Sequence, residues 1–444
     1  MGYDGDIAAL GGPERSLRLE ALARVAKASA EGAETAVPTV EVNNHVHTIY
    51  SFSPYSPSMV AYRAWRAGLQ AVGAMDHDSV GGAEELLEAG KIMRIGTTVG
   101  CEIRTSFIGT TMEGRKLNNP DVANIVYVTV HGIPRRRLAE TARFLQPVRS
   151  SREARGRRMV DRLNSLTAEY GIGPVDFDRD VYAISQASDG GTITERHILY
   201  ALCRKIIERT GRGLNLIAFV EGAMGIGLPE RIREYLRDEQ NPHYLYDLLG
   251  VLKGSFLPRF YITPDGEECP PVARVVGFAS SIGAIPAYPY LGDVEQSPTG
   301  DKLPEKFEDD FLDELFPEIV RLGFKAVTYM PPRNSRAQLE RLRAMCRRFE
   351  LMEISGVDIN SSRQSFSCPE ILLPEFHHLI DTTWALVAHE KLTSLDARLD
   401  LFGKKNPLSG RPLAERIAAY ADVGRRIDPA APELAAKLAP FAGK

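Results

Sequence analysis

The sequence of 444 residues has few cysteines, no excess of basic charge and no long apolar run. Its five cysteines are scattered and form no Cys-x-x-Cys pair, which argues against a thiolate zinc site or a disulfide framework and favours a reducing compartment. A net charge of −4 gives no electrostatic reason to expect a general nucleic-acid binder. No segment is apolar enough to cross a bilayer, and acidic residues stand where a signal peptide would be basic. We therefore expect a cytoplasmic protein without a membrane partner.

Two histidines one residue apart, His45 and His47, end a strand-like segment at residues 41–47. Side chains alternate faces along a strand, so these two imidazoles point the same way. Two neutral imidazoles a few ångströms apart suit a divalent metal ion better than they suit a packed core. An isolated His-x-His pair is common, so the interpretation depends on further ligands.

Further polar side chains follow where other apolar, β-rich segments end. They are Asp76, His77, Asp78, Glu102, His131 and Asp358. In α/β barrels the functional residues gather at the carboxyl ends of the strands. The agreement between residue type and position predicts a metal site at one mouth of such a barrel. The bland alternative for residues 76–78 is an N-cap and turn cluster that begins the next helix.

Strand-like and helix-like segments alternate through most of the chain, which is typical of a parallel sheet covered by helices. The expected strands are residues 41–47, 69–75, 96–101, 125–130, 284–288, 324–329 and 351–355. The expected helices are residues 14–32, 56–68, 82–89, 311–321 and 336–349.

The alternation breaks between residues 133 and 269, where the sequence is rich in helix and begins with a basic run at 149–158. We therefore expect a discontinuous barrel at 41–132 and 270–368 with a helical insertion at 133–269, called the insertion below. Residues 1–40 form an N-terminal helical extension in this interpretation, and residues 369–444 form a mostly polar, helical C-terminal tail.

The order of these motifs resembles the polymerase-and-histidinol-phosphatase (PHP) family of metal-dependent phosphoesterases. The local sequence agrees in His45-Val46-His47-Thr48, Met75-Asp76-His77-Asp78-Ser79-Val80-Gly81-Gly82 and Gly100-Cys101-Glu102. The resemblance covers most of residues 41–368. Residues 157–158, 191–198 and 326–334 look like the branch that acts on nucleoside 3′,5′-bisphosphates and short RNA. The resemblance implies a distorted, TIM-like barrel of seven strands.

The resemblance also implies a set of metal ligands. His45, His47, Glu102 and Asp358 would bind a first ion, and Glu102 would bridge to a second ion that His131 also binds. One or two divalent cations per chain are implied, with Mn, Zn or Fe suited to nitrogen and carboxylate ligands. A water held between two cations would lose its proton and attack phosphorus.

Other residues would handle protons and substrate. Asp78, His77 and His197 are candidates for proton transfer or for orienting ligands. The candidate substrate contacts are Arg157, Arg158, Arg196, His197 and Tyr288. His197 could equally be an ordinary helix-face histidine, and the arginine run could be a solvated helix face.

Three departures from the family pattern weaken the implied site. Tyr288 and Asn360 stand where the family often has histidine, and Ser53 stands where members with three metals have a further ligand. We therefore expect at most two metals and a weakened second site.

The leading hypothesis is a hydrolase that cleaves a small phosphorylated metabolite or nucleotide, or a short oligonucleotide. One alternative is a catalytically silent metal- or ligand-binding protein, as Tyr288 and Asn360 suggest. Another is a metal-dependent hydrolase of a different bond, such as an amide. That chemistry predicts a lysine at a strand end, and Lys91, Lys116 and Lys325 are poorly placed for it.

Overall fold

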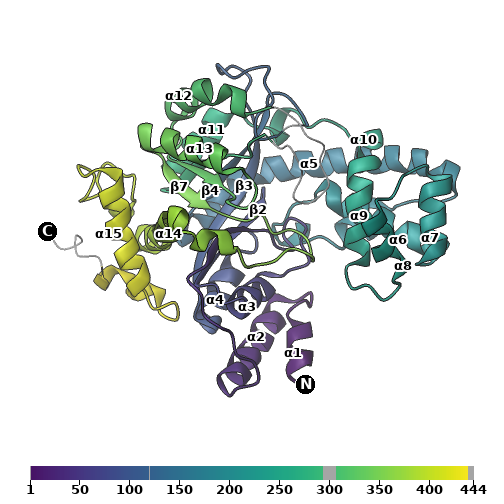
Figure 1. The fold of residues 1–444 in the computed structure, drawn as a ribbon, viewed down its shortest axis with the longest axis horizontal. Helices are drawn as coiled ribbons and strands as arrows, with labels where there is room; N and C mark the ends of the chain where they lie inside the picture. Colours follow the sequence, from purple (N-terminus) through teal and green to yellow (C-terminus); the bar gives the residue numbers. More distant parts are fainter. Residues whose placement is uncertain (1, 120, 294–306, 439–444) are drawn as a thin grey trace.

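A computed structural model describes residues 2–119, 121–293 and 307–438, and its strands form one seven-stranded sheet. The strands are β1 (Val42–Val46), β2 (Ala71–His77), β3 (Gly96–Ser106), β4 (Ile125–His131), β5 (Ile285–Pro289), β6 (Ala326–Tyr329) and β7 (Met352–Ser355). They lie in the sheet in chain order. Figure 1 shows the sheet at the centre of the molecule with helices around it.

The sheet nearly closes into a barrel because β1 also pairs with the segment that follows β7. Val46 forms a parallel bridge with Ile359. The amide of His47 donates to the carbonyl of Ile359 at 2.9 Å, and the amide of Ile359 donates to the carbonyl of His45 at 3.1 Å. The predicted seven-stranded α/β barrel is confirmed.

The expectation of a wholly parallel sheet is wrong at β4. This strand runs antiparallel to both β3 and β5, whereas all other neighbouring strands are parallel. The physical reason lies in the connection, since residues 107–119 and 121–124 contain no helix. A parallel neighbour needs a crossover, usually a helix, whereas an antiparallel neighbour can follow a simple loop.

The strand boundaries also differ from the predicted ones in two places that matter for the site. Strand β2 extends to His77, so Asp76 and His77 belong to the strand. Strand β3 extends to Ser106. Glu102 therefore lies within the strand, whereas the sequence had predicted that it follows the end of the strand.

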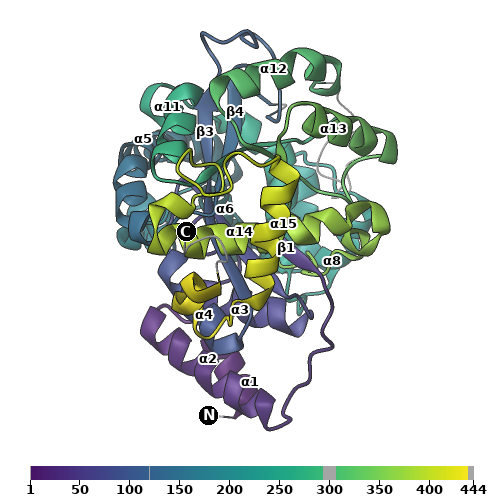
Figure 2. The same cartoon turned by 90° about the vertical axis from the view of Figure 1, so that its left-hand side faces the viewer.

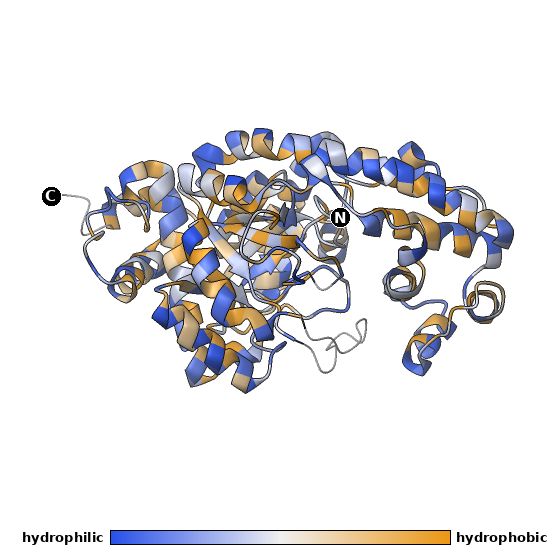
Figure 3. Cartoon of the chain, turned by 90° about the horizontal axis from the view of Figure 1, so that it is seen from above, coloured by the Kyte–Doolittle hydropathy of each residue, from blue (hydrophilic) through white to orange (hydrophobic). Residues whose placement is uncertain are grey.

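Helices outside the insertion cover the barrel and extend it at both ends of the chain. They are α1 (Tyr3–Ala9), α2 (Arg15–Ala30), α3 (Pro57–Arg66), α4 (Ala83–Met93), α11 (Val272–Ser281), α12 (Leu312–Leu322), α13 (Arg336–Arg348), α14 (His377–Leu395) and α15 (Leu413–Arg426). Helix α3 begins as its sequence predicts, because the Ser56 hydroxyl accepts the Met59 amide and Pro57 occupies the first turn. Figure 3 shows mixed hydrophilic and hydrophobic residues on these helices, as expected for helices with one buried face.

The described residues between β4 and β5 contain helices and no strand. The main helices are α5 (Leu138–Thr167), α6 (Glu195–Thr210), α7 (Leu214–Ala218), α8 (Glu230–Arg237), α9 (Tyr244–Ser255) and α10 (Leu257–Phe260). Residues 159–260 bury a hydrophobic cluster of their own, which also takes in Phe52 from the loop after β1. The first half of α5 instead contributes Leu138 and Leu145 to the barrel core. Figure 1 shows α5 reaching from the barrel to the group of α6 to α9.

The C-terminal tail, predicted to be mostly polar, contains a helix with little exposed surface, because α14 is buried along most of its length. It contacts β1, β3 and β7 and packs against α15, and Figure 2 shows α14 and α15 together beside the barrel. Two of its buried polar residues form hydrogen bonds with the barrel. Thr383 accepts from the Asn44 amide at 2.8 Å, and Glu390 accepts the Val99 backbone amide at 2.6 Å. Polar residues in the sequence therefore did not signal an exposed helix here.

Within the described part of the chain, no helix combines the length and apolar character needed to cross a membrane.

The contact between α14 and α15 yields a stability prediction. A methyl group at Gly424 would overlap the carbonyl oxygen of Trp384. We expect Gly424→Ala to lower the free energy of unfolding by about 1–3 kcal/mol through overpacking, measured by urea denaturation. Gly250, exposed in α9 with nothing within 4 Å of an added methyl, is the matched control. Gly250→Ala should raise stability by about 0.5–1 kcal/mol, and equal effects of the two substitutions would contradict the packing argument.

Candidate metal centre

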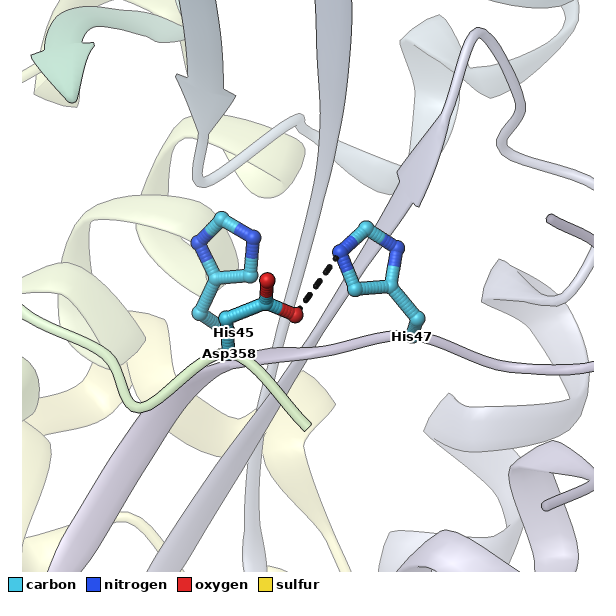
Figure 4. Close-up of side chains that lie close together, drawn as sticks. All are labelled: His45, His47 and Asp358. Carbon is cyan, nitrogen blue, oxygen red and sulfur yellow. Dashed lines mark ion pairs between the residues drawn. The ribbon is translucent and has the colours of Figure 1, made fainter. Parts of the chain in front are cut away.

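Three side chains from two distant parts of the chain meet where β1 pairs with the segment after β7. His45 and His47 come from the end of β1, and Asp358 follows β7. One potential ligand atom from each of the three lies within 4.8 Å of the others. His47 Nε2 is 3.3 Å from Asp358 Oδ1, and Figure 4 shows both histidine rings turned toward the carboxylate.

A second group consists of His47, His77 and Glu102, whose ligand atoms also lie within 4.8 Å of one another. The parallel register of β2 and β3 places His77 directly beside Glu102. His77 Nδ1 is 3.0 Å from Glu102 Oε2, and the rings of His47 and His77 are 4.6 Å apart. Because His47 belongs to both groups, the structure gathers four of the predicted metal ligands and His77, a predicted proton-transfer residue, into one continuous cluster.

The hydrogen bonds around His47 leave one of its nitrogens free for a ligand. The Ser51 hydroxyl donates to Asp76 Oδ1 at 2.6 Å, so its oxygen can only accept from His47 Nδ1, 3.2 Å away. This arrangement puts the proton on Nδ1. The opposite nitrogen, Nε2, is buried and forms no hydrogen bond, and it faces Asp358 Oδ1 at 3.3 Å. A histidine oriented through one nitrogen toward a carboxylate, with the other nitrogen free, is typical of metal ligands.

Charges within the cluster shift its pKa values in opposite directions. Burial lowers the pKa of His45 and raises that of Glu102. Burial would also lower the pKa of His47, but the Asp358 carboxylate outweighs it and the net shift is upward. Burial would raise the pKa of Asp358, but His47 and His45 hold it below the usual range. Nitrogen and carboxylate donors in this arrangement fit a divalent cation such as zinc, manganese or iron.

Neighbouring residues fix the position of Asp358. The Asn360 amide donates to Asp358 Oδ1 at 2.7 Å, and the Gln364 amide donates to the Asp358 carbonyl at 2.6 Å. Asn360, which stands where the family often has a histidine, therefore orients a candidate ligand. Gly356 allows a close approach, since a methyl group there would lie 2.5 Å from His45 Cβ.

His131 lies outside both groups. Because β4 is antiparallel to its neighbours, its carboxyl end faces away from the ends of β1 and β2. The pairing of Thr129 with Glu102 puts His131 deeper in the barrel than Glu102. Its ring is buried, Nε2 has no hydrogen-bond partner, and burial together with His45 lowers its pKa to about 3. His131 does end its strand, as predicted, but β4 runs opposite to β1 and β2, and the role of His131 as a metal ligand stays a prediction.

The side chains of Asp78 and Tyr288 form hydrogen bonds with residues outside the metal cluster. Asp78 follows β2 with a positive φ of 49°, and Arg152 donates to its Oδ2 at 2.5 Å. Its Oδ1 is buried without a partner. The Tyr288 hydroxyl donates to the buried carboxylate of Glu308, and Tyr288 is absent from the lining of the cavity described below. The predicted position of this hydroxyl in the site is not found.

Arg157 and Arg158, the predicted phosphate contacts, lie away from the cluster. Arg157 pairs with Glu153 and Asp178 on the outer face of α5, and Arg158 is exposed. Neither side chain is placed to reach a substrate beside His47.

The arginines of α5 that do face the barrel are Arg152 and Arg155, both 3% exposed. Glu195 joins them, because Arg152 donates to one of its oxygens at 3.1 Å and Arg155 to the other at 2.6 Å. Glu268 and Arg104 extend this buried network. Sequence reasoning overlooked these arginines, although helical spacing relates them to the buried Val148 and Met159 on one face of α5.

His197 and Arg196 lie at the start of α6 near the cluster. His197 Nδ1 accepts the Thr194 backbone amide at 3.0 Å and so caps the helix, while its ring packs edge-on against Phe52 at 4.9 Å. Arg196 donates to the Asn360 carbonyl at 3.3 Å and is close enough to Asp358 to lower the pKa of that carboxylate. Of the predicted substrate contacts, Arg196 therefore comes near a candidate ligand, and His197 is partly used in capping.

A cavity of about 80 Å³, open to solvent, adjoins the cluster. It is lined by His45, Glu102, Asn118, Tyr127, Pro289, Tyr290, Leu291, Thr328, Tyr329, Met330, Gly356 and Asp358. Polar candidate ligands thus form one wall, and aromatic and aliphatic side chains form the rest. Its volume is smaller than the roughly 300–1,000 Å³ of typical small-molecule sites.

No protein-family model and no curated protein sequence matches this chain. Two solved structures follow a similar course. A proposed metal-dependent phosphoesterase from Bifidobacterium adolescentis is 21% identical, with a TM-score of 0.48 over 74% of this chain and 91% of its own. An amidohydrolase from Chromobacterium violaceum, solved with sulfate and without metal, is 16% identical, with a TM-score of 0.47 over 73% and 89%. Likeness at this level concerns the outline of the fold.

The electrostatic coupling within the first group can be measured without any metal. Asp358→Asn removes the negative charge that raises the pKa of His47, so we expect the His47 pKa to fall in the metal-free protein. Titration of histidine-labelled protein by nuclear magnetic resonance gives this value. His389, fully buried and hydrogen-bonded to the Leu401 amide, should titrate as before. An unchanged pKa of His47 in Asp358→Asn would contradict the electrostatic contact between the two side chains.

The buried arginine network yields a prediction about stability. Glu195→Ala would remove one of the two carboxylates that Arg104, Arg152 and Arg155 share, leaving only Glu268 to all three, and we expect a loss of up to about 3–5 kcal/mol in the free energy of unfolding. Glu153→Ala removes only an exposed i,i+4 partner of Arg157 and should cost about 0.5 kcal/mol or less. Urea denaturation of both variants compares them, and similar losses would argue against the network.

Proposed function

We propose that this protein is a metal-dependent phosphoesterase in which His45, His47, Glu102 and Asp358 hold one or two divalent cations. The observation that carries the proposal is the buried Nε2 of His47, which faces the Asp358 carboxylate at 3.3 Å and forms no hydrogen bond unless a proton or a cation lies between them. A buried nitrogen without a partner costs free energy in a folded protein, and a bound cation would remove that cost. His77 extends the ligand set through Glu102, and His131 remains a predicted ligand.

Bound divalent cations would supply Lewis-acid chemistry and lower the pKa of water in the site. The chain's own residues would orient the substrate and exchange protons. His77 is a candidate for proton transfer, because its Nδ1 lies 3.0 Å from Glu102 beside the ring of His47. Asp78 has one unpartnered oxygen for the same purpose, and we keep His197 as a third candidate.

The surroundings of the cluster support a small, phosphorylated substrate. Arg196, close to Asp358, would attract a phosphate. The cavity offers Tyr127, Tyr290 and Tyr329 as surfaces for a flat organic group. We therefore propose a small phosphorylated metabolite or a nucleotide as the substrate, with a short oligonucleotide as an extended form of the latter. Action in the cytoplasm remains part of this proposal.

Two other functions make different demands on the same site. An amide hydrolase of this architecture would need a lysine among the ligands, and no lysine lines the described cavity. A catalytically silent metal-binding protein would keep the cluster but cleave nothing. The use of Tyr288 and Asn360 in internal hydrogen bonds keeps that second candidate open to experiment.

Replacement of a single ligand tests the proposal. Asp358→Ala should lose bound metal in elemental analysis, and phosphate release from p-nitrophenyl phosphate and from a nucleoside 3′,5′-bisphosphate should fall at least about 100-fold. The matched control is Asp178→Ala, which removes an exposed partner of Arg157 far from the cluster.

Each outcome separates the candidates. Metal and turnover that survive in Asp358→Ala would rule out this carboxylate as a ligand. The silent binding protein would be favoured by two results together. The wild-type protein would bind metal but cleave no phosphoester with Mn²⁺, Zn²⁺ or Fe²⁺, and Asp358→Ala would lose the metal.

A further inference from the structure

The segment that carries Asp358 also touches the insertion. Residues 358–364, called the Asp358 loop below, follow β7 and lead toward α14. The Asp358 side chain itself is 39% exposed, so packing alone does not hold it in place. Its position depends on the hydrogen bonds of its own loop and on whatever holds that loop.

The strongest contact between the loop and the insertion is a two-fold ion pair. Arg363 Nε donates to Asp247 Oδ1 at 2.6 Å, and its Nη2 donates to Oδ2 at 2.8 Å. The Asp247 side chain is 5% exposed, and the Asn241 amide donates to it at 2.8 Å. The Arg363 guanidinium also lies 3.7 Å from the centre of the Tyr235 ring. A paired guanidinium and carboxylate fix both distance and orientation.

Two further contacts join the Asp358 loop to the insertion. His243 Nδ1 lies 2.8 Å from the Ser362 hydroxyl, and Arg196 donates to the Asn360 carbonyl at 3.3 Å. The insertion therefore holds the loop at three of its residues.

The other side of the loop orients Asp358. Gln364, next to Arg363, donates to the Asp358 carbonyl and accepts the amides of Asn360 and Ser361 at 2.8 and 2.7 Å. Asn360 in turn donates to the Asp358 carboxylate. A shift of Arg363 would move Gln364 and with it the groups that aim the carboxylate at His47.

We propose that the insertion holds the Asp358 loop in its ligand-binding position, with Asp247 and Arg363 as positioning residues. The consequence for metal binding rests on the proposed function, because it requires that Asp358 is a ligand. The consequence for the loop does not, since it concerns only how the backbone of residues 358–364 is held.

The test compares Asp247→Ala, Arg363→Ala and the double variant. Hydrogen exchange of residues 358–364 is measured in the metal-free protein, and Co²⁺ affinity is measured by calorimetry. We expect faster exchange in the loop and at least about tenfold weaker Co²⁺ binding in each single variant. The double variant should be no worse than the singles, because both substitutions break the same contact. Arg363→Lys, which keeps the charge without the paired geometry, should recover part of the loss.

Arg233→Ala is the matched control, since it breaks an ion pair with Glu221 within the insertion that does not involve the loop. It should leave both loop exchange and Co²⁺ affinity at the wild-type values. Asp247→Asn, which preserves the side-chain shape, replaces Asp247→Ala if near-ultraviolet circular dichroism shows that the latter is misfolded.

The proposal is overturned if loop exchange is unchanged in the variants, or if it rises while Co²⁺ affinity stays at the wild-type value. A lower melting temperature with unchanged affinity would likewise mean that the ion pair is merely structural. If the wild-type protein itself binds no Co²⁺ but the loop exchanges faster in the variants, the proposed metal function fails and the holding of the loop stands.

Discussion

The site depends on the pairing of β1 with the segment that follows β7. The two backbone hydrogen bonds between Ile359 and the residues His45 and His47 close the barrel and set the register at that seam. A shift by one residue would turn Asp358 away from His47, because side chains alternate along extended segments. Gly356 lets the segment after β7 come close to β1, because the absence of a side chain leaves room for His45. One seam thus determines both the closure of the fold and the distances between candidate ligands.

The insertion contacts the loops that follow β1, β2 and β7, three strands whose ends carry candidate ligands. It receives Phe52 from the loop after β1, it binds Asp78 after β2 through Arg152, and it binds Arg363 after β7 through Asp247. Phe52 adopts a positive φ of 86°, a strained backbone conformation for an aromatic residue that is maintained by its surroundings. Buried ion pairs such as Arg152 with Asp78 are weak contributors to stability but fix orientation well. The insertion therefore matters for the geometry of the barrel mouth as well as for its own core.

The sequence predicted the seven-stranded barrel and most of the candidate ligands. Both predictions rested on local patterns, namely the alternation of strand-like and helix-like segments and the residue types at strand ends. The spacing of His45 and His47 follows from strand geometry alone, and Gly356 before Asp358 marks a close approach of backbone. The direction of β4 could not be predicted in this way, since it depends on how a loop without helix returns to the sheet. The depth of His131 follows from that direction. Arg152 and Arg155 were within reach of helical periodicity, but their acidic partners lie far away in the sequence.

A cluster of three histidines and two carboxylates at the mouth of a barrel lowers the stability of the fold. Buried polar atoms without partners, such as His47 Nε2, each cost on the order of 1–3 kcal/mol. Apolar residues of similar size would pack there without that cost. The pKa shifts express the same conflict, since burial pushes His45 and Glu102 toward neutral forms while Asp358 keeps its charge. A cation satisfies the free nitrogen and both carboxylates together. Binding of a cation, as proposed, would therefore explain why these five residues lie side by side.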